Sequence, residues 1–242
     1  MIRNIFLDAG GVILDETQFE NKSAEIIIGI INQHNEKYKS ENYWKDAEEA
    51  VYRFIPKVYD YVLYKNIVNI ENFRTAKTEY ENKMKSHNTL KLTDGITEFL
   101  AEFSKFYKIG TLGQYGIDFR NFLESKNILG YFTYKEIQDD YKITKPDTRY
   151  FEAVLRKCNC KAEESVMVGD RIDKDVIPAK LVGMKTIRIK TGIHKNQEPR
   201  TPEEIPDITV DKLSEIKTGA INEGCESADK SSAVYSGGIN GA

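Results

Sequence analysis

The sequence predicts an α/β fold, with a parallel sheet at its core and an inserted block of helices. Two observations lead to this prediction. Short apolar segments alternate with helical patterns over much of the chain. A block from 16 to 88, with almost no glycine, separates the first of these segments from all the others.

Five short segments have the apolar, β-prone composition of buried strands, and most are separated by helical patterns. The strand-like segments are 3–7, 106–112, 131–135, 165–168 and 185–189. The helical patterns outside the inserted block cover 94–104, 119–126, 147–158 and 173–181. Strands that alternate with helices form a parallel sheet with both faces covered. We therefore predict a Rossmann-like parallel sheet.

The block 16–88 differs from its flanks, because charged and aromatic residues recur in it at helical spacing and Pro56 is its one proline. The pattern predicts three helices, with breaks near positions 39, 65 and 87. The block follows the turn after the first strand, so it would lie above the carboxyl edge of the sheet, where open α/β sheets bind ligands. We therefore expect 16–88 to form a cap that acts as a lid.

The remaining segments complete the predicted domain organisation. The core would consist of 1–15 and 89–216. The segment 217–242 is rich in Gly, Ser, Ala and Asn and has no periodicity, which predicts a flexible tail.

The composition argues against several classes of protein. The net charge is -3 and Lys and Arg are spread along the chain, so we expect no nucleic-acid surface. No apolar run approaches the roughly 20 residues that a membrane span needs. The N-terminus lacks a signal-peptide pattern, and three cysteines are too few for a disulfide framework. We expect a cytoplasmic protein that binds a small molecule, and the oligomeric state stays open.

Polar residues stand at the carboxyl ends of the predicted strands. Asp8 ends the first strand, Gly113 and Gln114 follow the second, Lys145 lies in a loop after the third, and Asp170 follows the fourth. The carboxyl ends of parallel strands converge on one crevice. Several carboxylates in one crevice favour a cation between them, and an all-oxygen site suits Mg²⁺. These residues therefore predict a magnesium site that holds a phosphate.

The sequence resembles the haloacid dehalogenase superfamily in three motifs taken in order. They are DAGGVI from Asp8, Lys145 with Pro146, and the segment VGDRIDKDVIPAKLVGM that contains Asp170 and Asp175. The resemblance covers the whole core, and the inserted block resembles the small α-helical cap of that superfamily.

The resemblance implies a role for each of these residues in a Mg²⁺-dependent phosphatase. Asp8 would be the covalent nucleophile and a Mg²⁺ ligand, and Lys145 would orient it and the phosphoryl group. Gly10 would offer its carbonyl to the metal, and Asp170 and Asp175 would complete the metal site. Asp173 would have only a supporting role.

The groups expected to bind phosphate are the backbone N–H groups of two glycines and the side-chain amide of one glutamine. The backbone N–H of Gly11 could approach a phosphoryl group closely, because a glycine has no side chain in the way. Gly113 could offer its N–H, and Gln114 its side-chain amide. The implied substrate is a small phosphorylated metabolite.

The sequence departs from the superfamily at two of these positions. Phosphatases of the superfamily usually carry a second Asp where this chain has Gly10, and Thr or Ser where it has Gly113. General acid–base help is typically worth about 10²–10⁴-fold in rate. The departures predict a slow phosphatase, one that acts on esters with good leaving groups, or one whose acid comes from the cap or from water.

Three other functions stay open at this point. A metal-independent 2-haloacid dehalogenase also uses an Asp nucleophile, although it would not need the acidic residues Asp170, Asp173 and Asp175. A catalytically silent descendant that binds a ligand or a protein would explain Gly10 and Gly113. A phosphomutase would also need the second Asp that Gly10 replaces. The histidines His34, His87 and His194 receive no role.

Overall fold

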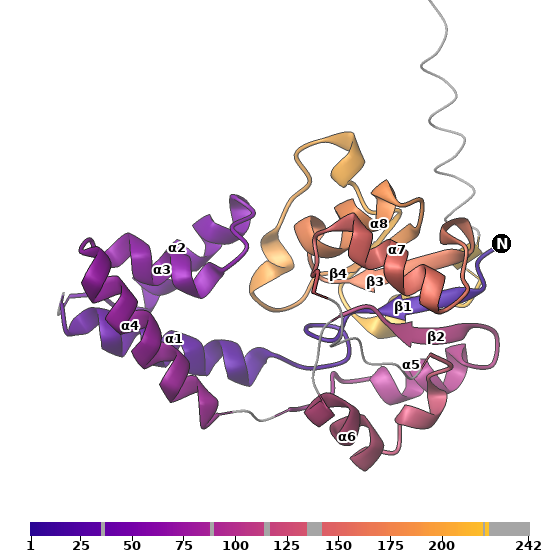
Figure 1. Ribbon diagram of the computed structural model, residues 1–242, viewed down its shortest axis with the longest axis horizontal. Helices are drawn as coiled ribbons and strands as arrows, with labels where there is room; N and C mark the ends of the chain where they lie inside the picture. Colours follow the sequence, from indigo (N-terminus) through magenta and orange to yellow (C-terminus); the bar gives the residue numbers. More distant parts are fainter. Residues whose placement is uncertain (35–36, 88–89, 114–116, 135–141, 220, 223–242) are drawn as a thin grey trace, which may run out of the picture.

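The computed structural model describes residues 1–34, 37–87, 90–113, 117–134, 142–219 and 221–222 of the 242-residue chain (Figure 1). Within them the core is a parallel five-stranded sheet with the order β2-β1-β3-β4-β5. The strands are β1 (Asn4–Leu7), β2 (Lys108–Thr111), β3 (Ser165–Gly169), β4 (Lys185–Ile189) and β5 (Ile208–Val210). The helices are α1 (Thr17–Asn32), α2 (Ser40–Tyr52), α3 (Val58–Asn66), α4 (Ile70–Lys85), α5 (Ile96–Phe103), α6 (Ile117–Ser125), α7 (Thr148–Lys157) and α8 (Ile177–Leu181). The predicted α/β fold class is confirmed.

Helices cover both faces of the sheet, as alternating side chains along β1 require. Ile5 and Leu7 are fully buried in the cluster formed with α5 and α6. Phe6 points the other way, into the cluster that holds Met167 and residues of α7 and α8. Figure 1 shows α7 and α8 on one side of the strands and α5 and α6 on the other. Burial on both faces explains why the strands read as continuous apolar runs.

The register of the sheet brings the carboxyl ends of three strands level with one another. Leu7 of β1 pairs with Thr111 of β2 on one side and with Val168 of β3 on the other. One residue further on, the Asp8 N–H still donates to the Val168 carbonyl, at 2.9 Å. Whatever follows these strands therefore emerges at a single edge.

Helices α1 to α4 form a separate layer with its own apolar core, seen on the left of Figure 1. Its fully buried side chains include those of Ile27, Tyr43 and Val62. The two segments that join it to the sheet run together, because the Asp15 N–H donates to the Lys91 carbonyl at 2.9 Å and their side chains form an ion pair at 2.8 Å. No helix among the described residues is long and apolar enough to cross a membrane.

The prediction of three helices in the block 16–88 is wrong, since the structure has four there. The helical spacing runs past residue 53, but α2 ends at Tyr52 and α3 begins at Val58. Pro56 cannot donate the hydrogen bond that an unbroken helix needs at its position. Phe54 has a φ of 56°, which right-handed helix does not allow.

Two other expectations about the core also need correction. The predicted strand 131–135 is wrong: Leu129–Tyr131 form a 3₁₀ turn, and Tyr134 makes an isolated bridge to Gly110. The sequence analysis did not predict β5, because this strand is short and only half-buried and therefore has no apolar run.

The predicted start of the flexible tail, at residue 217, is wrong, because the chain still packs against the core up to residue 222. Ile221 is fully buried in the cluster under α5. The Asn222 side chain accepts a hydrogen bond from the Ile2 N–H at 2.9 Å, and Tyr107 donates to the Thr218 carbonyl at 2.8 Å. Most of the predicted tail, 223–242, lies outside the described residues.

Candidate active site

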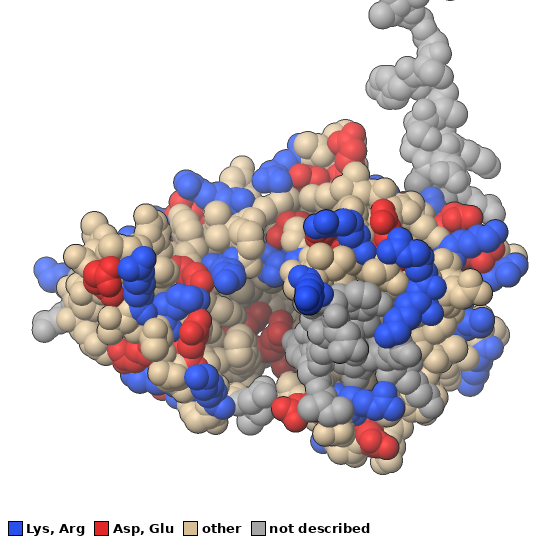
Figure 2. Space-filling view, viewed as in Figure 1, with Lys and Arg blue, Asp and Glu red and all other residues tan. Residues whose placement is uncertain are grey.

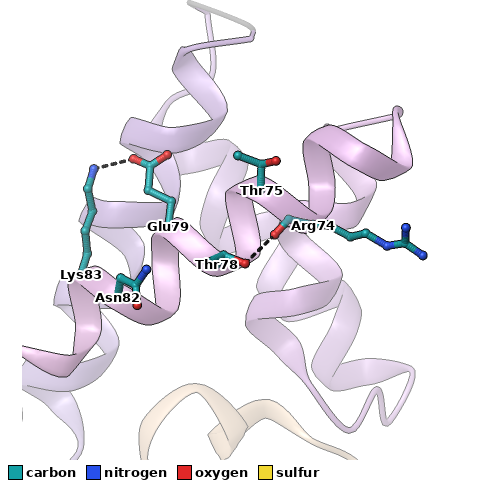
Figure 3. Close-up of a pocket in the computed structure, with 6 residues that line it drawn as sticks. All are labelled: Arg74, Thr75, Thr78, Glu79, Asn82 and Lys83. Atoms are coloured by element: carbon teal, nitrogen blue, oxygen red, sulfur yellow. Dashed lines mark hydrogen bonds and ion pairs between the residues drawn. The ribbon is translucent and has the colours of Figure 1, made fainter.

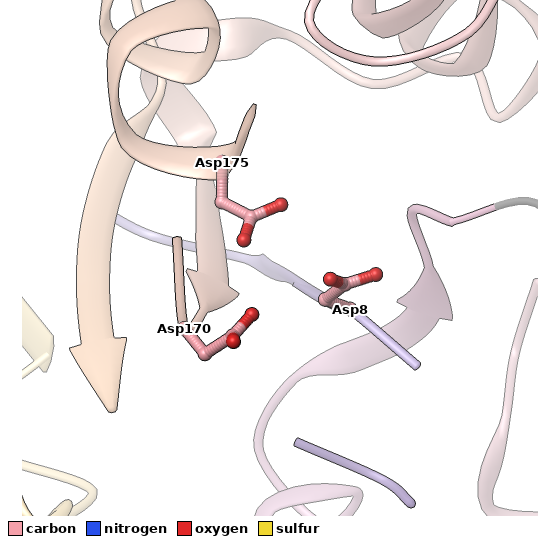
Figure 4. A group of neighbouring side chains, drawn as sticks. All are labelled: Asp8, Asp170 and Asp175. Atoms are coloured by element: carbon pink, nitrogen blue, oxygen red, sulfur yellow. The ribbon is translucent and has the colours of Figure 1, made fainter. Parts of the chain in front are cut away.

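Three aspartates converge at the carboxyl edge of the sheet. Asp8 follows β1, Asp170 follows β3, and Asp175 lies in a turn of π-helix, Ile172–Val176, just beyond Asp170. Figure 4 shows their carboxylates turned toward one another from three segments, and one oxygen of each lies within 4.8 Å of the others. The structure thus brings together residues that are as far as 167 positions apart in the sequence.

Lys145 is the cation among these carboxylates. Its Nζ lies 2.8 Å from Asp8 Oδ1 and 2.6 Å from Asp175 Oδ1. The Asp8 oxygen also accepts a hydrogen bond from the Ala9 N–H at 2.8 Å. Lys145 and Ala9 therefore hold the same oxygen, which fixes the rotation of the Asp8 carboxylate.

Asp173 belongs to the support of the site rather than to the carboxylate cluster. It pairs with Arg171 at 2.6 Å and accepts a hydrogen bond from the Gln197 side chain at 2.9 Å. Gln197 is fully buried, and its carbonyl oxygen accepts from the Ile172 N–H at 2.6 Å. The Arg171 N–H in turn donates to Asp175 Oδ2 at 3.0 Å. This network holds the loop that presents Asp175.

The carboxylate cluster carries more negative charge than one lysine balances. Burial, and then the carboxylates of Asp175 and Asp8, raise the pKa of Asp170 well above its usual value. Burial also raises the pKa of Asp175, to about 6, although Lys145 opposes the change. Burial lowers the pKa of Lys145, but Asp175 and Asp8 outweigh burial and raise it overall. Buried all-oxygen donors that repel one another fit a hard divalent cation such as Mg²⁺.

Gly113 lies directly against the nucleophile candidate. A Cβ atom at this position would be 2.7 Å from Asp8 Oδ1, so a side chain here would displace the Asp8 carboxylate. The nearby Asp8 carboxylate is therefore enough to explain why position 113 has no side chain. The predicted role of Gly113 in phosphate binding stays a prediction. Gln114, the other predicted phosphate ligand after β2, lies outside the described residues.

Gly11 has a φ of 70°, a backbone conformation that favours glycine. A Cβ there would lie 3.0 Å from the carboxyl carbon of Asp170. Its N–H donates to the Leu14 carbonyl at 2.9 Å, so the group proposed for phosphate is already hydrogen-bonded. The role of Gly11 as a phosphate ligand stays a prediction, as does that of the Gly10 carbonyl as a metal ligand.

A cleft lies between the helical layer and the core, and Arg171, the neighbour of Asp170, lines it. Its volume is about 370 Å³. Phe19, Tyr59 and Tyr80 line it from the helical layer, and Arg171 and His194 from the core. Figure 2 shows the hollow between the two layers, with acidic side chains inside it.

His194 received no role from the sequence, yet it lies in the wall of this cleft. Its imidazole is buried, and its Nδ1 has no hydrogen-bond partner within the described chain. Burial, and then the charge of Arg171, lower its pKa to about 3. His194 is therefore neutral at physiological pH. No local sequence signal marks it, because its burial depends on the packing of the helical layer against the core.

A larger hollow, of about 680 Å³, lies on the outer face of α4 (Figure 3). Its polar side chains are engaged with their own helix. Lys83 pairs with Glu79 at 2.7 Å, and Thr78 donates to the Arg74 carbonyl at 3.0 Å. This hollow has the features of a solvated helix face and lacks the converging carboxylates of the sheet edge.

The family of the chain follows from its sequence. Residues 11–189 match the model of the haloacid dehalogenase-like hydrolase family, and the chain belongs to this family. The predicted family and the predicted hydrolase class are confirmed.

Among known proteins, the chain is similar to two phosphatases. It is 29% identical over 189 residues to the glyceraldehyde 3-phosphate phosphatase of Methanocaldococcus jannaschii, a match that covers 74% of this chain and 73% of that protein. It is 33% identical over 97 residues to the phosphoserine phosphatase of Thermus thermophilus, covering 40% of this chain and 37% of that protein.

A solved structure shows the same fold. The hydrolase YfnB of Bacillus subtilis, whose structure holds magnesium, superposes with a TM-score of 0.59. The match covers 88% of this chain and 96% of that chain at 16% identity.

Proposed function

We propose that this protein is a Mg²⁺-dependent phosphatase of a small phosphorylated metabolite, and that Asp8 becomes transiently phosphorylated. One observation carries the proposal: one carboxylate oxygen each of Asp8, Asp170 and Asp175 lies within 4.8 Å of the others, and Lys145 pairs with Asp8 and Asp175. An enzyme that needed only the Asp8 nucleophile would have no use for two further buried carboxylates. The relatives named as phosphatases support the same reaction class.

Asp8, Asp170 and Asp175, with the carbonyl of Gly10, would hold the cation. When bound, Mg²⁺ would neutralise these carboxylates and reduce their repulsion toward the phosphate of the substrate. The ammonium of Lys145 would add positive charge beside the phosphoryl oxygens, since it lies 2.8 Å from the attacking carboxylate.

The chemistry on Asp8 has two steps. A carboxylate oxygen attacks phosphorus while the bond from phosphorus to the leaving-group oxygen breaks, which leaves an acyl phosphate on Asp8. Water then attacks the phosphorus, the bond to Asp8 breaks, and inorganic phosphate leaves. Lys145 and the Ala9 N–H keep the Asp8 carboxylate in one orientation throughout both steps.

The test is a phosphate-release assay on p-nitrophenyl phosphate, glyceraldehyde 3-phosphate and phosphoserine, with Mg²⁺ and then with EDTA. We expect activity that EDTA removes and that is lost in Asp8→Asn. Asp118→Asn, which changes an exposed aspartate in the first turn of α6, serves as the matched control and should keep wild-type activity.

Three results would contradict the proposal. Activity that survives EDTA or Asp8→Asn would exclude this use of the carboxylates. Halide release from a 2-haloacid without metal would identify a dehalogenase. Mg²⁺ binding without turnover of any phosphate ester would identify a silent descendant.

A further inference from the structure

The space beside Gly10 is occupied by a carboxylate that comes from another part of the chain. A Cβ built at Gly10 would lie 2.8 Å from each carboxylate oxygen of Glu16 and 2.9 Å from its carboxyl carbon. Gly10 stands two residues after Asp8. The Glu16 carboxylate therefore lies where a side chain at position 10 would project.

Glu16 also faces the cleft. It is half-buried, it directly precedes α1, and it lines the 370 Å³ cavity together with Arg171. It also lies beside Gly10, two residues after Asp8 of the carboxylate cluster. Glu16 is thus close to the carboxylate cluster and to the space open for a substrate.

Three neighbouring acids, Asp8, Asp175 and Glu20, hold other parts of the structure. Asp8 and Asp175 pair with Lys145. Glu20, the next acid on α1, accepts a hydrogen bond from the Ile193 N–H at 2.9 Å and lies against Gly192, so it joins the helical layer to the core. An alkyl phosphate needs a proton donor for its leaving oxygen, and a positioned side chain is the usual source.

We propose that Glu16 is the general acid and base of this active site, at the place left open by Gly10. The proposal rests on the phosphatase function proposed above. In the first step Asp8 bonds to phosphorus, the ester bond breaks, and the leaving oxygen takes the proton of Glu16. In the second step a water gives its proton to the Glu16 carboxylate and its oxygen to phosphorus, and the bond to Asp8 breaks. Both carboxyl groups return to their starting state.

This assignment connects the helical layer to the chemistry. Glu16 lies at the start of α1, whereas Gly10 belongs to the loop after β1. A displacement of α1 relative to the core would remove the acid from the site. The arrangement of the two layers is then part of the catalytic geometry.

The test compares Glu16→Gln with wild type on two esters. For glyceraldehyde 3-phosphate, an alkyl ester, we expect kcat/KM to fall by about 10²–10⁴-fold, the usual worth of a general acid. The leaving group of p-nitrophenyl phosphate departs as a stable anion without a proton. In a stopped-flow experiment the variant should therefore release one equivalent of nitrophenolate rapidly and then turn over slowly, because only the water step needs the base.

Two further variants test the spatial argument. In Gly10→Asp the new carboxylate would collide with Glu16, so we expect a loss of activity. In Gly10→Asp combined with Glu16→Ala the space is free, and activity on the alkyl ester should exceed that of Glu16→Ala alone. Glu25→Gln removes an exposed carboxylate from the same helix and is the matched control.

The outcomes separate the two proposals. Wild-type turnover of glyceraldehyde 3-phosphate by Glu16→Gln would overturn the role of Glu16 and leave the phosphatase intact. An equal loss on both esters without a burst, in a variant that still binds Mg²⁺ and melts as wild type does, would overturn it as well. A wild-type protein that hydrolyses neither ester would overturn the proposed function itself, and with it this role.

Discussion

Replacing Lys145 by Met removes a cation that contacts the carboxylates of Asp8 and Asp175. The Lys145 side chain is 11% exposed and that of Asp175 only 1%, so water does little to screen the pair. Methionine has nearly the same length and keeps most of the apolar contacts of the lysine stem. The substitution therefore tests the charge rather than the packing.

The expected loss of stability in Lys145→Met follows from the burial of its ion pair with Asp175. Removing one partner of a buried ion pair typically costs about 3–5 kcal/mol of stability, because the remaining charge is left unpaired. Lys91→Met removes a lysine that is 51% exposed and pairs with Asp15 at 2.8 Å. A pair of that kind contributes about 0–1 kcal/mol. The two lysines should thus differ by several-fold in their effect on the free energy of unfolding.

The loss of unfolding free energy in Lys145→Met should be larger at high pH than at low pH. The pKa of Asp175 is about 6 in the folded wild type against 3.8 for the ordinary residue. Ionisation of Asp175 therefore destabilises the folded state as pH rises through this range. Lys145 lowers that pKa, so its loss raises it further. At pH 5 Asp175 is largely protonated with or without Lys145, whereas at pH 8 the variant carries the full penalty.

Urea denaturation in EDTA at pH 5 and pH 8 measures both effects. The EDTA removes divalent cations, so that the carboxylates and Lys145 alone decide the result. We expect Lys145→Met to lose about 3–5 kcal/mol at pH 8 and clearly less at pH 5. A loss no larger than that of Lys91→Met, or a loss that grows toward low pH, would refute the reasoning.

Three other perturbations have definite expected outcomes. Asp170→Asn removes one of the mutually repelling carboxylates, so thermal melting in EDTA should shift upward, and the further upward shift produced by Mg²⁺ in the wild type should be lost. Gly113→Ala would place a Cβ 2.7 Å from Asp8 Oδ1, and we expect loss of phosphate release together with an overpacking cost of about 1–3 kcal/mol, measured by assay and by urea denaturation. Unchanged activity would show that the Asp8 carboxylate has room to move. Gln197→Leu leaves the Ile172 N–H without its acceptor, which should cost about 1–3 kcal/mol in urea denaturation, and a neutral result would contradict the supporting role of Gln197.

Local patterns in the sequence predict four of the five strands and the edge of the sheet where the site lies. The strands are buried on both faces, so they read as short apolar runs, and β1, β3 and β4 lie close to where those runs predict them. The polar residues that follow Asn4–Leu7 and Ser165–Gly169 reach one edge because parallel strands end together. Asp8 and Asp170 follow from the strand ends, whereas Lys145 follows a predicted strand that does not form, and Asp175 comes from the resemblance to the haloacid dehalogenase superfamily.

Only the tertiary structure decided which residues complete that edge. Asp173 has the same residue type as Asp170 and Asp175, but it pairs with Arg171 instead of joining them. Glu16 fills the space beside Gly10 because the chain turns back after β1 before α1 begins. The contacts of Asp173 and Glu16 depend on where the backbone turns and on what packs against it. Periodicity and spacing report the burial of a segment, but they do not report which side chain from elsewhere occupies the space that a glycine leaves open.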